Sequence, residues 1–332
     1  MYAERVAAAG GEPAVACLLC PHRCVLRAGA VGRCGVRAVE GGTLVSRNYA
    51  MVTGVSIDPI EKKPLYHFVP GSEILSVGTF GCNMGCQFCQ NWEISQAGAG
   101  GTRLEAEELV ALAEKCRDRS IGVAYTYSEP TVWYEYVLEC TRLVRAAGLR
   151  NVLVTNGFIN PEPLAELLPY VDAVNIDLKS MDEAFYRKVC KANPQPVLEA
   201  IERSVAAGCH VELTTLVIPG LNDDVEHIDR LAAWVAGLSR AIPLHLSRYF
   251  PNYKMSIAPS PLQTLAACAD AARAHLDYVF VGNAVLPGGS DTSCPNCGEV
   301  LIERRRLGLP PTVHMAEPRC PVCGVDVPVV LG

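Results

Sequence analysis

The chain has 332 residues, 50% of them hydrophobic and 19% charged, which is enough for one large domain with smaller appended modules. Its net charge of −6 gives no general affinity for polyanions and argues against a nucleic-acid partner. The first residues lack the apolar core of a signal peptide, and no apolar run reaches transmembrane length, so we expect a cytoplasmic protein without a membrane partner. Cysteines that are grouped in such a chain are expected to bind metals rather than form disulfides.

Four cysteines near the start of the chain predict a small metal-binding knuckle. Cys17, Cys20, Cys24 and Cys34 lie among glycine-rich turns, in a segment too small to fold on hydrophobic burial alone. Four thiolates suit zinc, whereas the crowded spacing, with a proline after the second cysteine, also fits ferredoxin-type ligation. Two alternatives therefore stay open, structural zinc as the first choice and an auxiliary iron–sulfur cluster as the second. We assign this module and its linker to residues 1–69.

The end of that linker is dense in charged and aromatic residues. They are Asp58, Glu61, Lys62, Lys63, Tyr66 and His67. We expect this segment to dock the N-terminal knuckle onto the domain that follows. The alternative is that it forms part of an active-site rim.

Residues 70–286 alternate strand-like and helix-like segments. The predicted strands are Glu73–Thr79, Gly122–Tyr127, Asn151–Thr155, Ala173–Leu178, Val211–Val217, Pro243–Leu246 and Tyr278–Val281. The predicted helices between them are Leu104–Arg119, Thr131–Ala147, Pro161–Leu168, Asp182–Val189, Val197–Ala207, Asp224–Leu238 and Leu262–Ala274. This order predicts an α/β fold, a partial or full (β/α) barrel of parallel strands. Functional residues are then expected at the carboxyl ends of the strands.

The loop after the first predicted strand carries three cysteines, Cys82, Cys86 and Cys89, in a C-x3-C-x2-C arrangement. Three thiolates this close can hold three irons of a [4Fe–4S] cube and leave the fourth iron without a protein ligand. A structural zinc site normally needs four ligands in two separated pairs, and no fourth candidate follows closely. The spacing, with Phe88 before the third cysteine, resembles the radical S-adenosylmethionine (SAM) superfamily. The resemblance implies that the open iron binds SAM and that its reductive cleavage yields a 5′-deoxyadenosyl radical.

The segment after the second strand, residues 125–130, resembles the Gly-Gly-Glu-Pro segment of radical SAM enzymes. The resemblance implies that Ser128 and Glu129 contact the methionine amino group of SAM. Tyr127 and Ser128 stand where that family has two glycines. The alternative is a helix N-cap formed by Ser128 ahead of Pro130, and both readings are compatible because they use different groups.

Two further strand ends resemble the glycyl-radical-enzyme activases. Asn156 lies in a Thr-Asn-Gly segment, although Val154 stands where an aspartate precedes the threonine in those enzymes. Asp177 and Lys179 match their Asp-Leu-Lys pattern, and alternate positions on one strand point to the same face. The resemblance implies contacts to SAM, with Lys179 as the carboxylate partner. A structural ion pair is the alternative.

Polar and aromatic residues also gather at the end of the sixth strand. We interpret this group as the substrate or SAM-ribose side of the barrel mouth, with His245 and Tyr249 as cofactor-binding candidates. The remaining members are Ser247, Arg248, Asn252, Tyr253 and Lys254.

After a Pro-Gly-Gly-Ser linker, residues 287–332 contain two matching Cys-Pro-x-Cys-Gly knuckles. Cys294, Cys297, Cys320 and Cys323 give a C-x2-C-x22-C-x2-C pattern that predicts a zinc ribbon, although rubredoxin iron uses the same geometry. We expect an appended module without catalytic residues of its own.

The other cysteines and the only tight basic run receive structural interpretations. The isolated cysteines are expected to be small buried hydrophobes, and they are Cys116, Cys140, Cys190, Cys209 and Cys268. The run Arg304, Arg305 and Arg306 is expected to be a solvated face.

Taken together, the knuckle, residues 58–68, the cluster loop, the strand ends and residues 247–255 resemble the AmmeMemoRadiSam-system radical SAM enzymes, relatives of the pyruvate formate-lyase activating enzymes. The resemblance implies a [4Fe–4S] cluster, SAM, and a flavodoxin or ferredoxin as electron donor. Hydrogen is then abstracted from a small molecule, a peptide or a partner protein, the last as a glycyl-radical-enzyme activase. A zinc-dependent scaffold without enzymatic activity is the alternative from another class. The motifs name neither the substrate nor a catalytic residue beyond the cofactor sites.

Overall fold

The computed structural model describes residues 2–8, 10–98, 100–304 and 309–332. Within these residues, the largest sheet has eight strands in the order β15-β14-β13-β12-β11-β10-β8-β7. The parallel strands are β8 (Glu73–Gly78), β10 (Ser120–Tyr125), β11 (Arg150–Thr155), β12 (Ala173–Asp177), β13 (His210–Val217), β14 (Leu244–Arg248) and β15 (Val279–Gly282). β7 and β15 stand at opposite edges of the sheet, so the barrel is partial.

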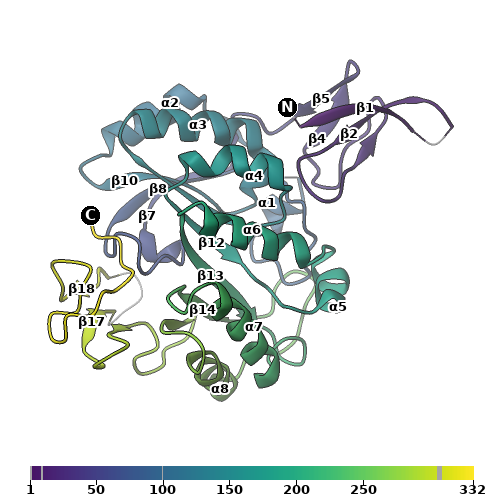
Figure 1. Cartoon of the computed structure of the whole chain (residues 1–332). Coiled ribbons are helices and arrows are strands. Elements are labelled where there is room, and N and C mark those ends of the chain that lie inside the picture. The colour runs from purple at the N-terminus through teal and green to yellow at the C-terminus, as the bar shows by residue number, and fades with distance from the viewer. Residues whose placement is uncertain (1, 9, 99, 305–308) are drawn as a thin grey trace.

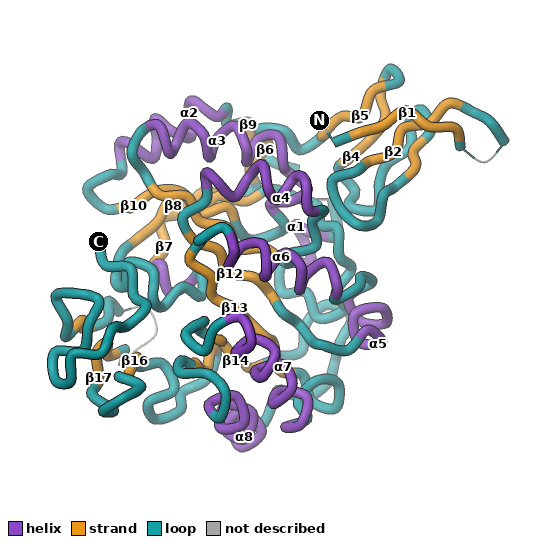
Figure 2. Tube along the Cα trace, viewed as in Figure 1, coloured by secondary structure: helices purple, strands orange, loops and turns teal. Residues whose placement is uncertain are grey.

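Helices connect the parallel strands and lie along one side of the curved sheet (Figures 1 and 2). They are α2 (Ala106–Lys115), α3 (Tyr134–Ala146), α4 (Pro161–Leu167), α6 (Gln195–Ala206), α7 (Val225–Leu238) and α8 (Leu262–Arg273). Shorter helical pieces are η1 (Ile60–Lys62), α1 (Trp92–Ser95), η2 (Pro130–Trp133), η3 (Leu168–Tyr170), α5 (Glu183–Phe185) and the π-helix η4 (Tyr186–Cys190). The apolar stripes of the long helices and the sheet form one continuous core, as expected when amphipathic helices cover a buried parallel sheet.

The predicted parallel strands are confirmed, each with ends within two residues of the observed bounds. An extra strand, β7 (Gly54–Pro59), pairs antiparallel with β8 and extends the same sheet. Its residues belong to the segment that the sequence suggested as a linker.

The N-terminal module forms small antiparallel sheets. Their strands are β1 (Ala3–Ala7), β2 (Pro13–Cys17), β3 (Val25–Leu26), β4 (Arg37–Glu40) and β5 (Thr43–Ser46). A separate two-stranded pair, β6 (Met51–Val52) with β9 (Thr102–Arg103), follows in the chain. The module is fixed to the barrel by Arg37, which forms a bidentate ion pair with Glu135 of α3, and by Asn160, whose backbone and side-chain nitrogens donate to Leu19 O and Leu18 O. It lies on the opposite side of the molecule from the C-terminal ribbon (Figure 1).

The ribbon contains β16 (Thr292–Ser293), β17 (Val300–Glu303) and β18 (Thr312–Val313). It shares an apolar cluster with the barrel, in which Tyr66 and Phe280 pack against ribbon residues. The backbone of Val330 also pairs with that of His67 and Val69. Residues 58–68 were expected to dock the N-terminal knuckle. Instead, their second half packs against the C-terminal ribbon. This contact was not predicted because the two segments are far apart in the sequence.

Arg304 corrects the expectation of a solvated basic face. Its side chain is only 6% exposed and lies over the Tyr66 ring at 4.2 Å. Arg305 and Arg306, the rest of that run, lie outside the described residues. None of the helices among the described residues has the length and apolarity needed to cross a bilayer.

Candidate functional site

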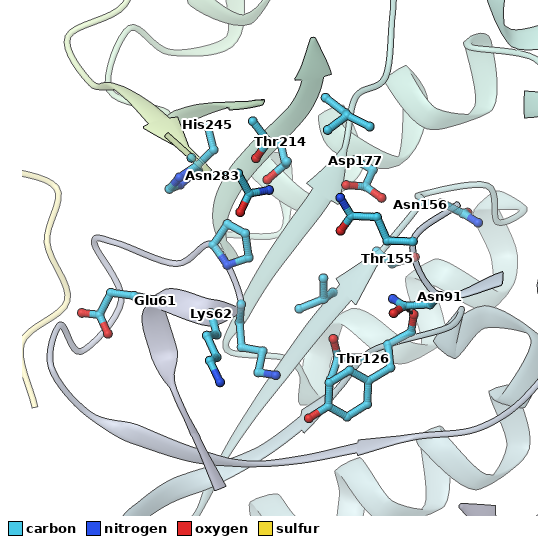
Figure 3. A pocket seen from close by; sticks show the side chains of 18 of the residues that line it. Glu61, Lys62, Asn91, Thr126, Thr155, Asn156, Asp177, Thr214, His245 and Asn283 are labelled. Carbon is cyan, nitrogen blue, oxygen red and sulfur yellow. Dashed lines mark hydrogen bonds between the residues drawn. The ribbon is translucent and has the colours of Figure 1, made fainter. Parts of the chain in front are cut away.

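One cavity of about 500 Å³ opens where the parallel strands end. Its wall combines the cluster loop, the carboxyl ends of the strands, residues 59–66 and part of the ribbon. Figure 3 shows Asn156 and Asn91 on one side of this space and Glu61 and His245 on the other. The volume lies within the range of small-molecule and cofactor sites. The strand ends therefore meet at one site, as the barrel fold requires.

Cys82, Cys86 and Cys89 all line this cavity, and their loop is fixed from several sides. The amide of Met84 donates to the Cys82 sulfur at 3.4 Å, and the Cys89 sulfur lies 3.2 Å from the Ser95 hydroxyl. Burial raises the pKa of Cys82 well above its ordinary value, which disfavours a free thiolate. Metal coordination is the usual way in which such a buried thiolate is stabilised.

Cys190 lies beside this loop, although the sequence suggested only an isolated buried residue. Its carbonyl accepts a hydrogen bond from Gly85 N at 2.8 Å, and its thiol is hydrogen bonded to Cys86. That bond lowers the pKa of Cys86, and burial raises the pKa of Cys190. Cys190 is buried, as expected, but its position behind Cys86 could not be inferred from residues 104 positions apart in the chain.

Glu129 connects neighbouring strand ends through hydrogen bonds. It is 1% exposed and lines the cavity, and its carboxylate accepts hydrogen bonds from Thr131 N, Thr155 Oγ1 and Asn156 N. Burial raises the pKa of Glu129, and the hydrogen bonds from Asn156 and Thr131 partly offset that effect. The helix cap belongs to Glu129 rather than to Ser128, because Thr131 N donates to the Glu129 side chain. The Ser128 hydroxyl lies in the cavity wall and has no hydrogen-bond partner among the described residues.

Asn156 connects Glu129 to the cluster loop. Its amide nitrogen donates to Asn83 Oδ1 at 2.9 Å and lies 3.6 Å from the Cys82 sulfur. Its Oδ1 accepts a hydrogen bond from Phe158 N. Asn156 therefore orients the loop that carries the first cysteine.

Tyr127 takes over the role expected of a glycine. Its φ is +73°, in the left-handed region that favours glycine, so the turn keeps the shape of the resembled segment. The phenol donates to Asp58 Oδ2 at 2.7 Å, and the Lys63 Nζ lies 4.7 Å from the ring centroid. Lys63 also donates to Asp58 at 2.9 Å. Residues 59–66 therefore form one wall of the cavity, a role that the sequence offered only as the alternative to docking.

Asp177 and Lys179 form an ion pair within the cavity wall, with 2.7 Å between Nζ and Oδ2. Burial alone would lower the pKa of Lys179, but the negative charges of Asp177 and Cys86 raise it well above the ordinary value. A permanently charged lysine beside the cysteine loop is suited to bind an anionic group, such as a carboxylate.

His245 lines the cavity at the sixth strand, whereas Tyr249 does not. The Glu212 carboxylate receives His245 Nε2 at 2.6 Å and the backbone amides of Tyr66 and His67 at 2.9 and 2.7 Å. Burial would raise the pKa of Glu212, but the hydrogen bonds from His210 and His245 hold it well below its usual range. Tyr249 is fully buried in the core and donates its hydroxyl to Met255 O, because the chain turns away from the cavity there. The expectation that Tyr249 binds the cofactor is therefore corrected.

The ribbon completes the far wall of the cavity through Arg304. Its guanidinium donates to Tyr66 O at 2.5 Å and to Ser290 O and Thr292 Oγ1 at 3.1 Å each. Its Nε lies 4.0 Å from Glu61 Oε1. The ribbon is thus part of the site enclosure.

The ribbon cysteines have the geometry of a site for a single metal ion. The sulfurs of Cys294, Cys297, Cys320 and Cys323 all lie within 4.8 Å of one another. Two pairs are separated by 3.5 and 3.6 Å. A tetrahedral ion with Zn–S bonds of about 2.3 Å requires similar separations.

Comparisons with known proteins agree with this geometry. Residues 76–232 match the model of the radical SAM superfamily. "Uncharacterized protein MJ0808" of Methanocaldococcus jannaschii is 40% identical over 324 residues, 96% of this chain and 96% of that protein. The chain belongs to the radical SAM superfamily. It is therefore an enzyme, and the superfamily implies a [4Fe–4S] cluster and SAM as cofactors.

Further similarities place this superfamily member near the activating enzymes. The pyruvate formate-lyase-activating enzyme of Clostridium pasteurianum is 28% identical over 192 residues, 54% of this chain and 77% of that enzyme. A radical SAM methyltransferase from Sphaerobacter thermophilus has a similar fold, with a TM-score of 0.50 and 20% identity over 70% of this chain and 71% of that one. The alternative of a non-enzymatic zinc scaffold is wrong, because the superfamily consists of enzymes.

The residues present fit these cofactors. Three cysteines line a cavity that is also lined by the charged pair Asp177–Lys179 and by Ser128, whose hydroxyl has no hydrogen-bond partner in the described part of the chain. Cys82, Cys86 and Cys89 are the residues that would hold the cluster, and Ser128, Glu129, Asn156 and Lys179 lie within the same enclosure.

Proposed function

We propose that this enzyme cleaves SAM reductively at a [4Fe–4S] cluster held by Cys82, Cys86 and Cys89, and that it then abstracts hydrogen from a substrate bound in the same cavity. The observation that carries the proposal is the convergence of the three cysteines with charged side chains from several strand ends on one enclosed space. When bound, the cluster supplies one electron to SAM, which generates the 5′-deoxyadenosyl radical.

The protein's own residues would position SAM and exclude water. Lys179, held charged by Asp177, is the proposed partner of the SAM carboxylate. Ser128 and Glu129 line the same cavity, and we propose that they bind the methionine amino group of SAM. Asp177 itself, Asn156 and His245 complete the proposed cofactor contacts, with His245 fixed by Glu212. Enclosure of a reactive intermediate limits side reactions with water.

A glycyl-radical-enzyme activase is the second candidate. The similarity to a pyruvate formate-lyase-activating enzyme favours it, as does the Asp-Leu-Lys pattern at Asp177–Lys179. The partner protein would then present a glycine to the cavity. A flavodoxin or ferredoxin is the proposed electron donor in either case, and the cytoplasm is the proposed location.

Zinc is the proposed metal of the C-terminal ribbon, supported by the compact sulfur set. Its proposed role is structural, because the ribbon supplies Arg304 to the far wall of the cavity. Residues 1–69, 70–286 and 287–332 remain the proposed division into knuckle, barrel and ribbon, with β7 contributed to the barrel sheet by the first of these.

The test is anaerobic incubation of the reconstituted enzyme with SAM and dithionite, followed by chromatography for methionine and 5′-deoxyadenosine. Each of Cys82→Ala, Cys86→Ala and Cys89→Ala is expected to abolish SAM cleavage and the visible absorption of this cluster, because the cube needs three thiolates. Cys116→Ala, outside the cavity wall, is the control and should keep both. Full cleavage by any of the three loop variants would refute the proposal.

A further inference from the structure

The cysteine sets of this molecule differ in how far their sulfurs stand apart. The ribbon set is compact, with all four sulfurs within 4.8 Å of one another. Cys17, Cys20, Cys24 and Cys34 all line one small cavity, yet in the described part of the chain no three of their sulfurs form such a compact set. Thiolates bound to a single zinc ion stand about 3.8 Å apart. Thiolates at the corners of an iron–sulfur cube stand further apart. By this measure, the knuckle differs from the ribbon and resembles the cluster loop, whose three sulfurs are likewise not compact.

A buried cation lines the same small cavity. Arg37 has a side chain that is 2% exposed, and two of its nitrogens bind Glu135. Its Nε is buried and has no hydrogen-bond partner among the residues described. The backbone amides of Val36 and Arg37 also donate to the Cys34 sulfur. Hydrogen bonds to sulfur and nearby charge are the means by which a protein stabilises an iron–sulfur cluster and sets its potential.

The knuckle also touches the cluster loop directly. His22 Nε2 lies 2.7 Å from Asn83 O. The carbonyl of Cys34 packs so closely against Gly81 that a Cβ there would lie 2.8 Å from it. Gly81 and Asn83 are the two neighbours of Cys82 in the chain. Two of the knuckle's chain segments thus contact the loop on either side of its first cysteine.

We propose that the knuckle holds a second [4Fe–4S] cluster, which relays an electron from an external donor protein to the cluster loop. The relay role rests on the proposed function. In each turnover, the donor, a reduced flavodoxin or ferredoxin, loses one electron, and the knuckle cluster is reduced and then reoxidised. The electron ends in the C–S bond of SAM that breaks. No bond forms and no proton moves at the knuckle. The first choice made from the sequence, structural zinc, is the competing outcome.

Metal analysis of the full chain tests the site itself. After anaerobic reconstitution, the wild type is expected to hold about eight irons and eight sulfides per chain, as two cubes require. Cys20→Ser/Cys34→Ser should lose about half of the iron and no zinc, and Cys294→Ser/Cys320→Ser should lose zinc and no iron. Loss of zinc with full retention of iron in the knuckle variant would overturn the proposal.

A second variant controls for the possibility that the knuckle substitutions cause misfolding. The triple variant Cys82→Ser/Cys86→Ser/Cys89→Ser leaves the knuckle intact and should retain about four irons per chain, with the electron paramagnetic resonance signal of one reduced cluster. Iron-free protein from this variant would overturn the proposal. Iron at the knuckle of a wild-type protein that does not cleave SAM would instead refute the proposed function and leave the metal site standing.

The relay is tested by changing the reductant. Cys20→Ser/Cys34→Ser is expected to lose SAM cleavage driven by reduced flavodoxin or ferredoxin, but to retain cleavage driven by dithionite, which is small enough to enter the cavity. Arg319→Ala, an exposed change on the ribbon, serves as the control and should support both reactions. Equal rates for the knuckle variant and the wild type with the protein donors would overturn the relay.

Discussion

The knuckle and the ribbon are both four-cysteine modules, but they contact opposite parts of the site. The knuckle packs against the residues that flank Cys82, whereas the ribbon packs against Tyr66 and Phe280 and places Arg304 in the far wall of the cavity. Their sulfurs differ as well, compact in the ribbon and wider in the knuckle. The comparison teaches that two modules with the same number of cysteines can differ in sulfur spacing and in packing partners. We therefore propose a role in electron transfer for the knuckle and a role in cavity shape for the ribbon.

Removal of the ribbon metal should have the largest effect on the protein. Cys294→Ser/Cys320→Ser is expected to unfold the ribbon, because metal binding supplies about 10–16 kcal/mol to small zinc modules. The exposed cluster around Tyr278 and Phe280 should then bind a hydrophobic dye and become sensitive to proteolysis. The loop cluster should survive, and substrate-free SAM cleavage should continue slowly. Loss of the loop iron would show that the ribbon belongs to the barrel core.

A single ribbon side chain should give a smaller effect of the same kind. Arg304→Met removes the hydrogen bonds that Arg304 donates to Tyr66 O, Ser290 O and Thr292 Oγ1, and we expect a loss of about 3 kcal/mol in the free energy of unfolding. Arg304→Lys keeps the charge but not the forked geometry, so it should fall between wild type and Arg304→Met. Denaturant titration measures these differences. An unchanged midpoint for Arg304→Met would mean that the ribbon is not fixed through this residue.

Much of this arrangement could be predicted from the sequence, because it depends on local patterns. Apolar runs separated by amphipathic segments located every parallel strand, and the loop cysteines lie within eight residues of one another. Two of the failures involve long-range partners. The burial of Arg304 depends on Tyr66, and the position of Cys190 depends on Cys86. Tyr249 was misplaced because polarity near a strand end does not say which way the chain turns.

SAM affinity tests the roles of Glu129 and Lys179 in the cavity wall. Glu129→Gln and Lys179→Met are each expected to weaken SAM binding while the cluster stays in place, since a charge-assisted hydrogen bond to a buried ligand contributes about 1.5–3 kcal/mol. Equilibrium dialysis of the reconstituted enzyme measures the affinity. Lys115→Met, an exposed change on α2, is the control. Unchanged affinity in both cavity variants would assign Glu129 and Lys179 a structural role only.

The smallest expected effect is a pH dependence at the ribbon interface. His67 is fully buried between the barrel and the ribbon, with Nε2 3.1 Å from Thr292 Oγ1 and Nδ1 unpartnered among the described residues. Burial lowers the pKa of His67 to about 3, from an ordinary value of 6.5. Below pH 6.5 the unfolded chain therefore takes up a proton that the folded chain does not, so stability is present above this pH and is lost as the pH falls toward 3.

His67→Gln should remove this contribution, which is at most about 1.4 kcal/mol per pH unit within that window. The amide still reaches Thr292, so the variant tests the proton rather than the contact. The neighbouring groups Glu212, His210, His245 and Arg304 stay unchanged in both proteins. Thermal unfolding between pH 7 and pH 5 is the measurement, with the partly exposed His275→Gln as the control. We expect the variant's midpoint to fall less steeply with acid than that of the wild type, and parallel slopes would show that His67 is not the group that couples ribbon docking to pH.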